Sequence, residues 1–151
     1  MKDKINVKRG KVSKAKGKAF EIRVRKDLID KGWIVSRFDN DVKDNELVQA
    51  KTSWRRTPHG MFPMNISPGF PDYLCLIRVM IADTGIQSYE VIGVESKMEG
   101  ELDKKEKEKC VWLLKNNIFS KILIAKKLKV KNRIVVEYSD FKEKYWRFYK
   151  K

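Results

Sequence analysis

The chain has few of the side chains that bind transition metals most often. It contains two cysteines, Cys75 and Cys110, and one histidine, His59. Three such side chains cannot complete the four-ligand sphere of a structural zinc site, so any metal must be held mainly by oxygen atoms. Both cysteines lie in apolar stretches, which favours buried free thiols over a disulfide. His59 lies in a polar loop, and we expect it to be exposed.

Long hydrophobic runs are also missing. The longest, Tyr73 to Ala82, is interrupted by Arg78 and is much shorter than the roughly 20 residues of a membrane-spanning helix. The first residues, Met1 to Lys4, are not followed by the apolar core of a signal peptide. We therefore expect an intracellular, cytoplasmic protein with no membrane partner.

Acidic residues are too few to balance the basic ones. The 151 residues include 35 Lys and Arg against 20 Asp and Glu, a formal net charge of +15. Such a surplus points to a polyanionic partner, and nucleic acid is the class that the rest of the chain supports. Basic residues dominate the first 18 positions, which predicts a flexible basic arm (1–18) ahead of a single domain (19–151).

Apolar periodicity predicts an α/β fold, a mixed β-sheet flanked by helices. The predicted strands are 33–38, 73–82, 89–94, 121–126 and 133–138. The predicted helices are 19–31, 102–117 and a last one that starts at 139–140. Between the first two strands we expect a polar turn (39–45), an ambiguous segment (46–54) and a loop (55–69). The charged first half of the helix at 102–117 is expected to project beyond the core.

One carboxylate falls on the inward arc of the first predicted helix. At about 100° per residue, Glu21 and Arg25 lie between two apolar flanks. The flanks consist of Phe20, Val24 and Leu28 on one side and Ile22 and Ile29 on the other. Because an unpaired buried charge is costly, Glu21 needs a partner, either Arg25 one turn later or a group across the core.

Two further carboxylates stand at the ends of predicted strands. Of four acid-x-Lys tripeptides in the chain, only Glu95-Ser96-Lys97 ends an apolar strand, and strand geometry places Glu95 and Lys97 on one face. Asp72 begins the preceding apolar strand. If these strands are neighbours, less than about 5 Å apart, Asp72 and Glu95 can share one cation.

Each of these residues also fits an ordinary structural role. Asp72 could cap a turn, Glu95 and Lys97 could form an edge ion pair, and Glu21 could pair with Arg25. Taken together in a strongly basic chain, they favour a shared functional site.

At this point the motifs resemble a known family. Gly69-Phe70-Pro71-Asp72 before a strand and Glu95-Ser96-Lys97 at a strand end resemble the PD-(D/E)xK nuclease superfamily. The upstream helix with Glu21 resembles its archaeal Holliday-junction-resolvase and VRR-NUC branches. The resemblance covers about residues 16–126. It implies a restriction-endonuclease-like core that hydrolyses DNA phosphodiester bonds with Mg²⁺ or Mn²⁺, with a role in DNA recombination and repair.

The resemblance also implies residue roles. Asp72 and Glu95 would be carboxylate ligands of the metal, with the backbone carbonyl of Ser96 as a third ligand. Lys97 would orient or activate the attacking water and stabilise developing negative charge. Glu21 would complete the acidic cluster, directly or through water.

Phosphate contacts are expected from polar residues around these motifs. The candidates are Lys14, Lys16, Lys18, Arg25, Arg55, Arg56 and Ser67. Such contacts position a protein on nucleic acid without reading its sequence. Trp54 and Phe62 could stack on bases.

The sequence hypothesis is a metal-dependent, structure-selective DNA endonuclease similar to a junction resolvase, with branched DNA as a substrate and a homodimer as an option. Two alternatives stay open. One is a non-catalytic nucleic-acid-binding protein in which the same residues are structural. The other is a nuclease of this fold that nicks, acts as an exonuclease or cleaves RNA.

Overall fold

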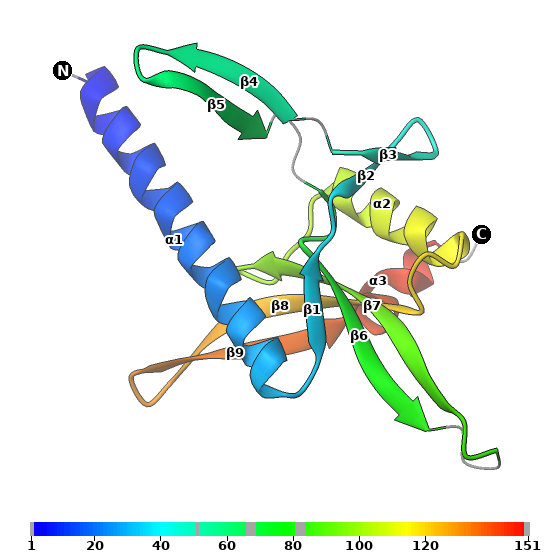
Figure 1. Cartoon of the computed structure of the whole chain (residues 1–151). Coiled ribbons are helices and arrows are strands. Elements are labelled where there is room, and N and C mark those ends of the chain that lie inside the picture. The colour runs from blue at the N-terminus through cyan, green and yellow to red at the C-terminus, as the bar shows by residue number, and fades with distance from the viewer. Residues whose placement is uncertain (1, 51, 66–68, 81–83, 150–151) are drawn as a thin grey trace.

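A five-stranded mixed sheet forms the centre of the protein (Figure 1). The computed structural model describes residues 2–50, 52–65, 69–80 and 84–149, without the side chains of 2–9, 11, 52–55 and 62–65. The strands, in spatial order, are β1 (Ile34–Arg37), β6 (Tyr73–Met80), β7 (Gln87–Lys97), β8 (Lys121–Val130) and β9 (Arg133–Asp140). Only β7 and β8 are parallel. The expected α/β class is confirmed.

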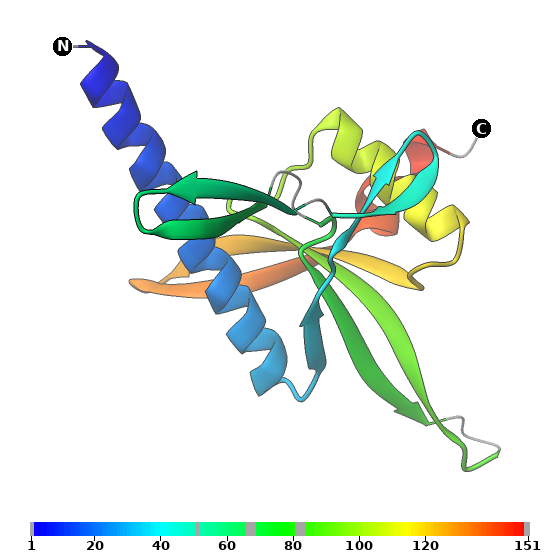
Figure 2. The ribbon, with the colours of Figure 1, turned by 45° about the horizontal axis from the view of Figure 1, so that its top comes forward.

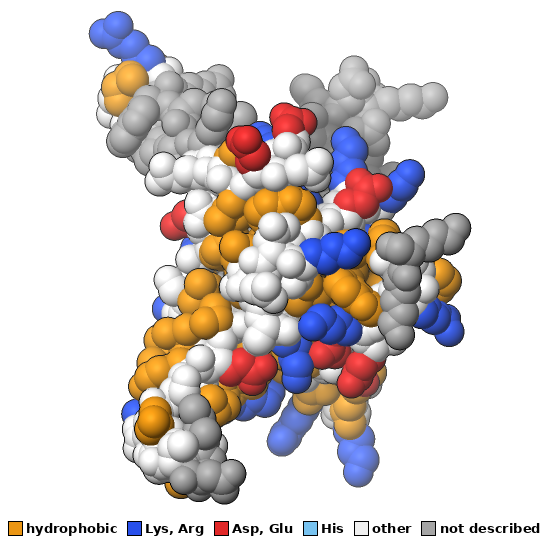
Figure 3. All heavy atoms as spheres, turned by 90° about the vertical axis from the view of Figure 1, so that its right-hand side faces the viewer, with side chains coloured by type: hydrophobic (Ala, Val, Ile, Leu, Met, Phe, Trp, Pro, Cys, Tyr) orange, Lys and Arg blue, Asp and Glu red, His pale blue; other side chains and the backbone are white. Residues whose placement is uncertain are grey.

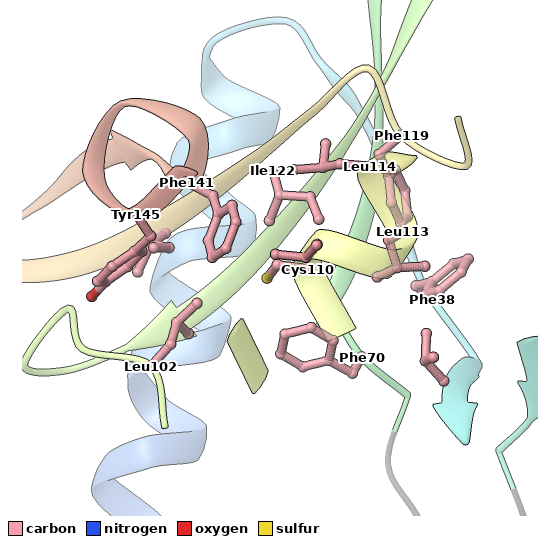
Figure 4. Close-up of a cluster of buried hydrophobic side chains, with 13 residues drawn as sticks. Phe38, Phe70, Leu102, Cys110, Leu113, Leu114, Phe119, Ile122, Phe141 and Tyr145 are labelled. Carbon is pink, nitrogen blue, oxygen red and sulfur yellow. The ribbon is translucent and has the colours of Figure 1, made fainter. Parts of the chain in front are cut away.

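Helices cover both faces of this sheet. On one face, α1 (Lys2–Asp30) packs Phe20, Val24 and Leu28 onto β6 and β7. On the other, α2 (Lys104–Lys115) and α3 (Phe141–Tyr145), with the short 3₁₀ helix η1 (Trp146–Phe148), form a second apolar cluster around Cys110 (Figure 4). Within the described part of the chain, no helix is long and apolar enough to cross a membrane.

The N-terminal segment is helical, so the first helix begins well before the predicted residue 19. One helix of 29 residues runs from Lys2 to Asp30, and its N-terminal half extends away from the sheet (Figures 1 and 2). Lysine is a good helix former and the segment contains no proline. The second apolar flank is also corrected, because Ile22 and Ile29 are exposed. The sheet covers only one stripe of this helix.

Two small hairpins replace the turn and loop expected between residues 39 and 69. The first pairs β2 (Asn40–Lys43) with β3 (Glu46–Gln49), and the second pairs β4 (Thr52–Thr57) with β5 (Gly60–Asn65). Asp44 and Asn45 connect β2 to β3 with positive φ angles of 51° and 60°, the geometry of a two-residue hairpin turn.

The longest hairpin, β6–β7, was predicted and is confirmed, with eight residue pairs in antiparallel register. Its far end projects from the body and exposes hydrophobic side chains (Figure 3), among them Val79, Met80 and Ile86. Its near end is buried between the two helical layers. That near end carries Asp72 and Glu95.

Glycines allow the segment before β6 to pack closely at this end. A Cβ on Gly69 would lie 1.6 Å from the backbone oxygen of Phe38, and a Cβ on Gly93 would lie 2.8 Å from Cγ of Pro71. Both contacts are closer than real Cβ atoms tolerate. Gly69 and Gly93 therefore let Pro71 pack against β7, with Asp72 next to the end of that strand.

Candidate functional site

Asp72 and Glu95 lie side by side where β6 begins and β7 ends. The backbone N–H of Ser96 donates to Oδ2 of Asp72 at 2.9 Å, and the backbone N–H of Asp72 donates to Oε2 of Glu95 at 3.1 Å. Each carboxylate thus accepts a hydrogen bond from the backbone of the other segment. The expectation that these two strands are neighbours is confirmed.

Lys97 lies between two carboxylates. Its Nζ is 3.3 Å from Oε1 of Glu95, which confirms that the two side chains share a face, and it also forms an ion pair with Glu106 on α2. The second oxygen of Glu106 accepts the backbone N–H of Asp103 at 2.9 Å, and Asp103 caps α2 in return. A single glutamate therefore joins the helix cap to the lysine.

Sequence reasoning missed Glu106, along with Arg37, Asp41 and Lys109, which line the same cleft. The charged first half of α2 does not simply project beyond the core, because Glu106 and Lys109 both line the cleft that contains Asp72 and Glu95. A signal was present in the sequence: Asp103 followed by Glu at the third helical position is a capping box. That motif fixes a helix start, but it does not reveal what lies across from it.

Glu21 lines the same cleft, and its partner comes from across the core. Nη2 of Arg37 on β1 lies 3.4 Å from Oε2 of Glu21, and the hydroxyl of Tyr73 donates to the Glu21 backbone carbonyl at 3.0 Å. Arg25, the alternative partner, is exposed. The three predicted acids, Glu21, Asp72 and Glu95, therefore open onto one cleft of about 520 Å³.

A second ion pair closes another side of this cleft. Asp41 on β2 is buried and pairs with Lys109 on α2. The ammonium group of Lys109 also lies 5.5 Å from the ring centroid of Phe70. The β2–β3 hairpin is thereby attached to α2 at the rim of the cleft.

Burial dominates the electrostatics of the acids. Burial, together with the nearby charges of Asp72 and Glu106, raises the pKa of Glu95 to about 8, and Lys97 opposes the shift. Burial also raises the pKa of Asp72, against the hydrogen bond from the Ser96 backbone. The pKa of Glu21 is raised by burial and then by the charge of Asp72. Burial therefore holds the pKa values of all three acids above their ordinary range, and neighbouring acids add to the effect at Glu95 and Glu21.

Lys97 stays protonated in this setting. Burial alone would lower its pKa, but the hydrogen bond to Glu106 and the charge of Glu95 outweigh it, so its pKa is raised. Lys97 is therefore a fixed positive charge and not a proton acceptor near neutral pH.

The oxygen ligands suit a magnesium-type ion better than a zinc-type ion. Among the described residues, no three His, Cys, Asp or Glu side chains gather closely enough to hold a metal by themselves. Mg²⁺, however, commonly takes one or two protein carboxylates and fills its other positions with water and phosphate oxygens. Asp72 and Glu95 supply two such carboxylates, whose mutual repulsion a cation would relieve. These residues fit Mg²⁺ or Mn²⁺.

The predicted phosphate contacts are spread over several surfaces. Lys14, Lys18 and Arg25 are exposed on the side of α1 that carries Glu21, whereas Lys16 lines a different cavity. Arg56 is exposed on the β4–β5 hairpin. The remaining predictions, namely Ser67 and the side chains of Arg55, Trp54 and Phe62, lie outside the described residues.

The three side chains that were expected to play no special part behave as predicted. Cys75 and Cys110 are buried free thiols, and His59 is exposed. None of them lines the acidic cleft.

Comparison with known proteins identifies no relative. No protein-family model matches the chain, no curated protein is significantly similar in sequence, and no solved structure is significantly similar in fold.

Proposed function

We propose that the protein is a metal-dependent nuclease that hydrolyses DNA phosphodiester bonds at Asp72, Glu95 and Lys97. The observation that carries the proposal is the reciprocal hydrogen bonding of Asp72 and Glu95 beside a protonated lysine, in a chain of net charge +15. Neighbouring carboxylates that share a single lysine with Glu106 attract a divalent cation, and the surrounding basic protein attracts a polyanion. A mixed sheet with acids at two strand ends is compatible with a restriction-endonuclease-like core.

Each residue has a distinct part in this proposal. Asp72 and Glu95 would hold the ion, with the Ser96 carbonyl as a further oxygen ligand if the resemblance holds at this position. Mg²⁺ or Mn²⁺ supplies polarisation of the phosphoryl group and a lowered pKa for bound water. Lys97 offsets the negative charge that develops on the phosphate in the transition state. Because the pKa of Lys97 is raised, it orients the water as a hydrogen-bond donor and does not remove its proton.

Glu21 contributes at the edge of the cluster. Its side chain is bound by Arg37 and is influenced by the charge of Asp72. It therefore acts through water rather than as a direct ligand. The preferred substrate, branched DNA cut by a homodimer, follows from the motif resemblance and is part of the proposal.

A cleavage assay tests the proposal. Four-way junctions, flaps, duplexes and single strands of labelled DNA, and RNA of the same sequences, are incubated with the protein and Mg²⁺, Mn²⁺ or EDTA. We expect cleavage of a DNA substrate that requires the metal and is lost in Asp72→Ala and Lys97→Ala. Asp30→Ala, which removes an exposed acid from α1, is the matched control and should remain active.

Two outcomes would contradict the proposal. Tight, salt-sensitive DNA binding without cleavage by the wild-type protein would favour a non-catalytic binding protein. Cleavage that survives both Asp72→Ala and Lys97→Ala would place the chemistry elsewhere.

A further inference from the structure

The buried residues Phe20, Val24 and Leu28 form a stripe along α1, and the cations of the helix lie on both sides of it. At about 100° per residue, Lys14, Lys18 and Arg25 share an arc of about 60° with Glu21. Lys16 and Arg23 lie on the opposite side of the stripe. The cations of α1 therefore form two separate rows. The row with Lys14, Lys18 and Arg25 leads to the acidic cleft, and the row with Lys16 and Arg23 does not.

Contacts in the structure support this division. Glu21 lines the acidic cleft, whereas Lys16 and Arg23 line a separate cavity of about 270 Å³ together with Lys127. Arg23 also donates a hydrogen bond to the backbone carbonyl of Ile134 on β9 at 3.2 Å. The two edges of α1 thus face different surroundings.

The three cations on the Glu21 edge are available to a ligand. Lys14, Lys18 and Arg25 are exposed, and within the described part of the chain none of them forms an ion pair. Lys18 is close enough to Glu21 for its charge to lower the pKa of that carboxyl, against the larger effect of burial. The β4–β5 hairpin, with the exposed Arg56, reaches toward the N-terminal half of α1 (Figures 1 and 2).

We propose that Lys14, Lys18 and Arg25 bind phosphates of the strand that is cut, spaced about two to three nucleotides apart, so that this strand runs along α1 and passes Glu21 at the cleft. The inference rests on the proposed nuclease function. Lys14 lies about 10 Å from Glu21 along the helix axis and Arg25 about 6 Å on the other side. At about 3.4 Å per nucleotide of one strand, the Lys14 side spans about three nucleotides and the Arg25 side about two.

The first test measures binding, which does not depend on cleavage. Fluorescence anisotropy of a labelled 30-base-pair duplex is recorded in EDTA over a range of salt concentrations. The variants are Lys14→Ala/Lys18→Ala and, as a matched control on the same helix, Lys16→Ala/Lys26→Ala. All four positions are exposed, and alanine favours helix, so both variants should fold.

We expect the slope of log affinity against log salt to fall by about 2 in Lys14→Ala/Lys18→Ala and to change little in the control. Equal losses of salt dependence in the two variants would overturn the proposal. DNA binding would then depend on the total charge of α1 and not on which edge of the helix carries it.

The second test measures the length of strand that the site needs. The position of the cut is mapped in a long DNA, and the strand is then shortened one nucleotide at a time on either side. The rate of wild-type cleavage should fall roughly tenfold when the strand on the Lys14 side of the cut is left with fewer than about three phosphates. The mapping shows whether this is the 5′ or the 3′ side. In Lys14→Ala/Lys18→Ala the rate should be low and independent of length on that side.

The outcomes separate this inference from the proposed function. A length requirement that is unchanged in Lys14→Ala/Lys18→Ala would refute the phosphate track and leave the nuclease intact. If the wild-type protein cleaves nothing, the proposed function fails, and the anisotropy comparison still decides whether Lys14 and Lys18 bind phosphate in preference to Lys16 and Lys26.

Discussion

Replacing Glu95 by glutamine should make the protein more stable in alkaline solution. Glu95 is only 6 % exposed, and burial, reinforced by Asp72 and Glu106, raises its pKa from the ordinary 4.5 to about 8. The folded protein therefore holds the Glu95 proton more tightly than the unfolded chain does. The stability that this provides is complete below pH 4.5 and is lost as the pH rises through 8.

The size of the effect follows from the shift. A displacement from 4.5 to about 8 corresponds to roughly 5 kcal/mol of unfolding free energy between the two ends of this pH range. Glu95→Gln keeps the shape and can still accept the N–H of Asp72. It removes the ionisation, and Lys97 keeps Glu106 as its partner. The variant should therefore lack most of this fall in stability.

The assay is urea unfolding at pH 5 to 9 in EDTA, followed by circular dichroism. The difference between wild type and Glu95→Gln isolates Glu95 from other titrating groups. Glu108→Gln, an exposed acid on α2, is the control and should follow the wild type. Adding Mg²⁺ or Mn²⁺ at pH 8 to 9 should stabilise the wild type and not Glu95→Gln. An identical pH slope in both proteins would refute the reasoning.

Two further changes separate the site from its scaffold. Glu106→Gln can still complete the capping box with Asp103 but no longer pairs with Lys97, so we expect about 10 to 100 times slower cleavage with an unchanged unfolding midpoint. Asp103→Ala should do the reverse, losing about 1 kcal/mol of stability and little activity; parallel losses in the two variants would contradict this separation. Gly69→Ala forces a Cβ to within 1.6 Å of a backbone oxygen and should cost about 3 kcal/mol, measured by thermal unfolding. Gly10→Ala, with open space around it, serves as its control and should be neutral or slightly stabilising.

The sequence predicts the sheet and α2 well because their burial patterns are strong. The apolar runs of β6 and β7 leave few alternatives to buried strands, and Asp103 marks the start of α2 both by its position and by its capping chemistry. The two small hairpins at residues 40–65 were missed. They are short and stand apart from the central sheet, so the alternation that marks a half-buried strand is weak in them.

The site could be predicted only in part. The sequence identified the acids and the lysine, but not the side chains from other elements that pair with them. Glu95 and Lys97 are two residues apart, and their shared face follows from strand geometry alone. Arg37 and Glu106, in contrast, reach Glu21 and Lys97 only after α1, β1 and α2 have packed on the sheet. Helical periodicity placed Glu21 beside the buried flank of Phe20, Val24 and Leu28, but it wrongly added a second buried flank and could not identify which cation would meet Glu21.

The position of Lys97 explains why a protein of net charge +15 can hold acids whose pKa values are raised. Most of its cations are solvated and contribute little to the field inside the cleft. Lys97 is the cation in contact with Glu95, and Glu106 shares it. Glu95 contacts Lys97 and accepts the backbone N–H of Asp72, and Asp72 accepts the backbone N–H of Ser96, so the negative charges of the cluster are offset only in part. A divalent ion would offset them, and the phosphate that accompanies it would meet the cations along α1, so metal and DNA should each strengthen binding of the other.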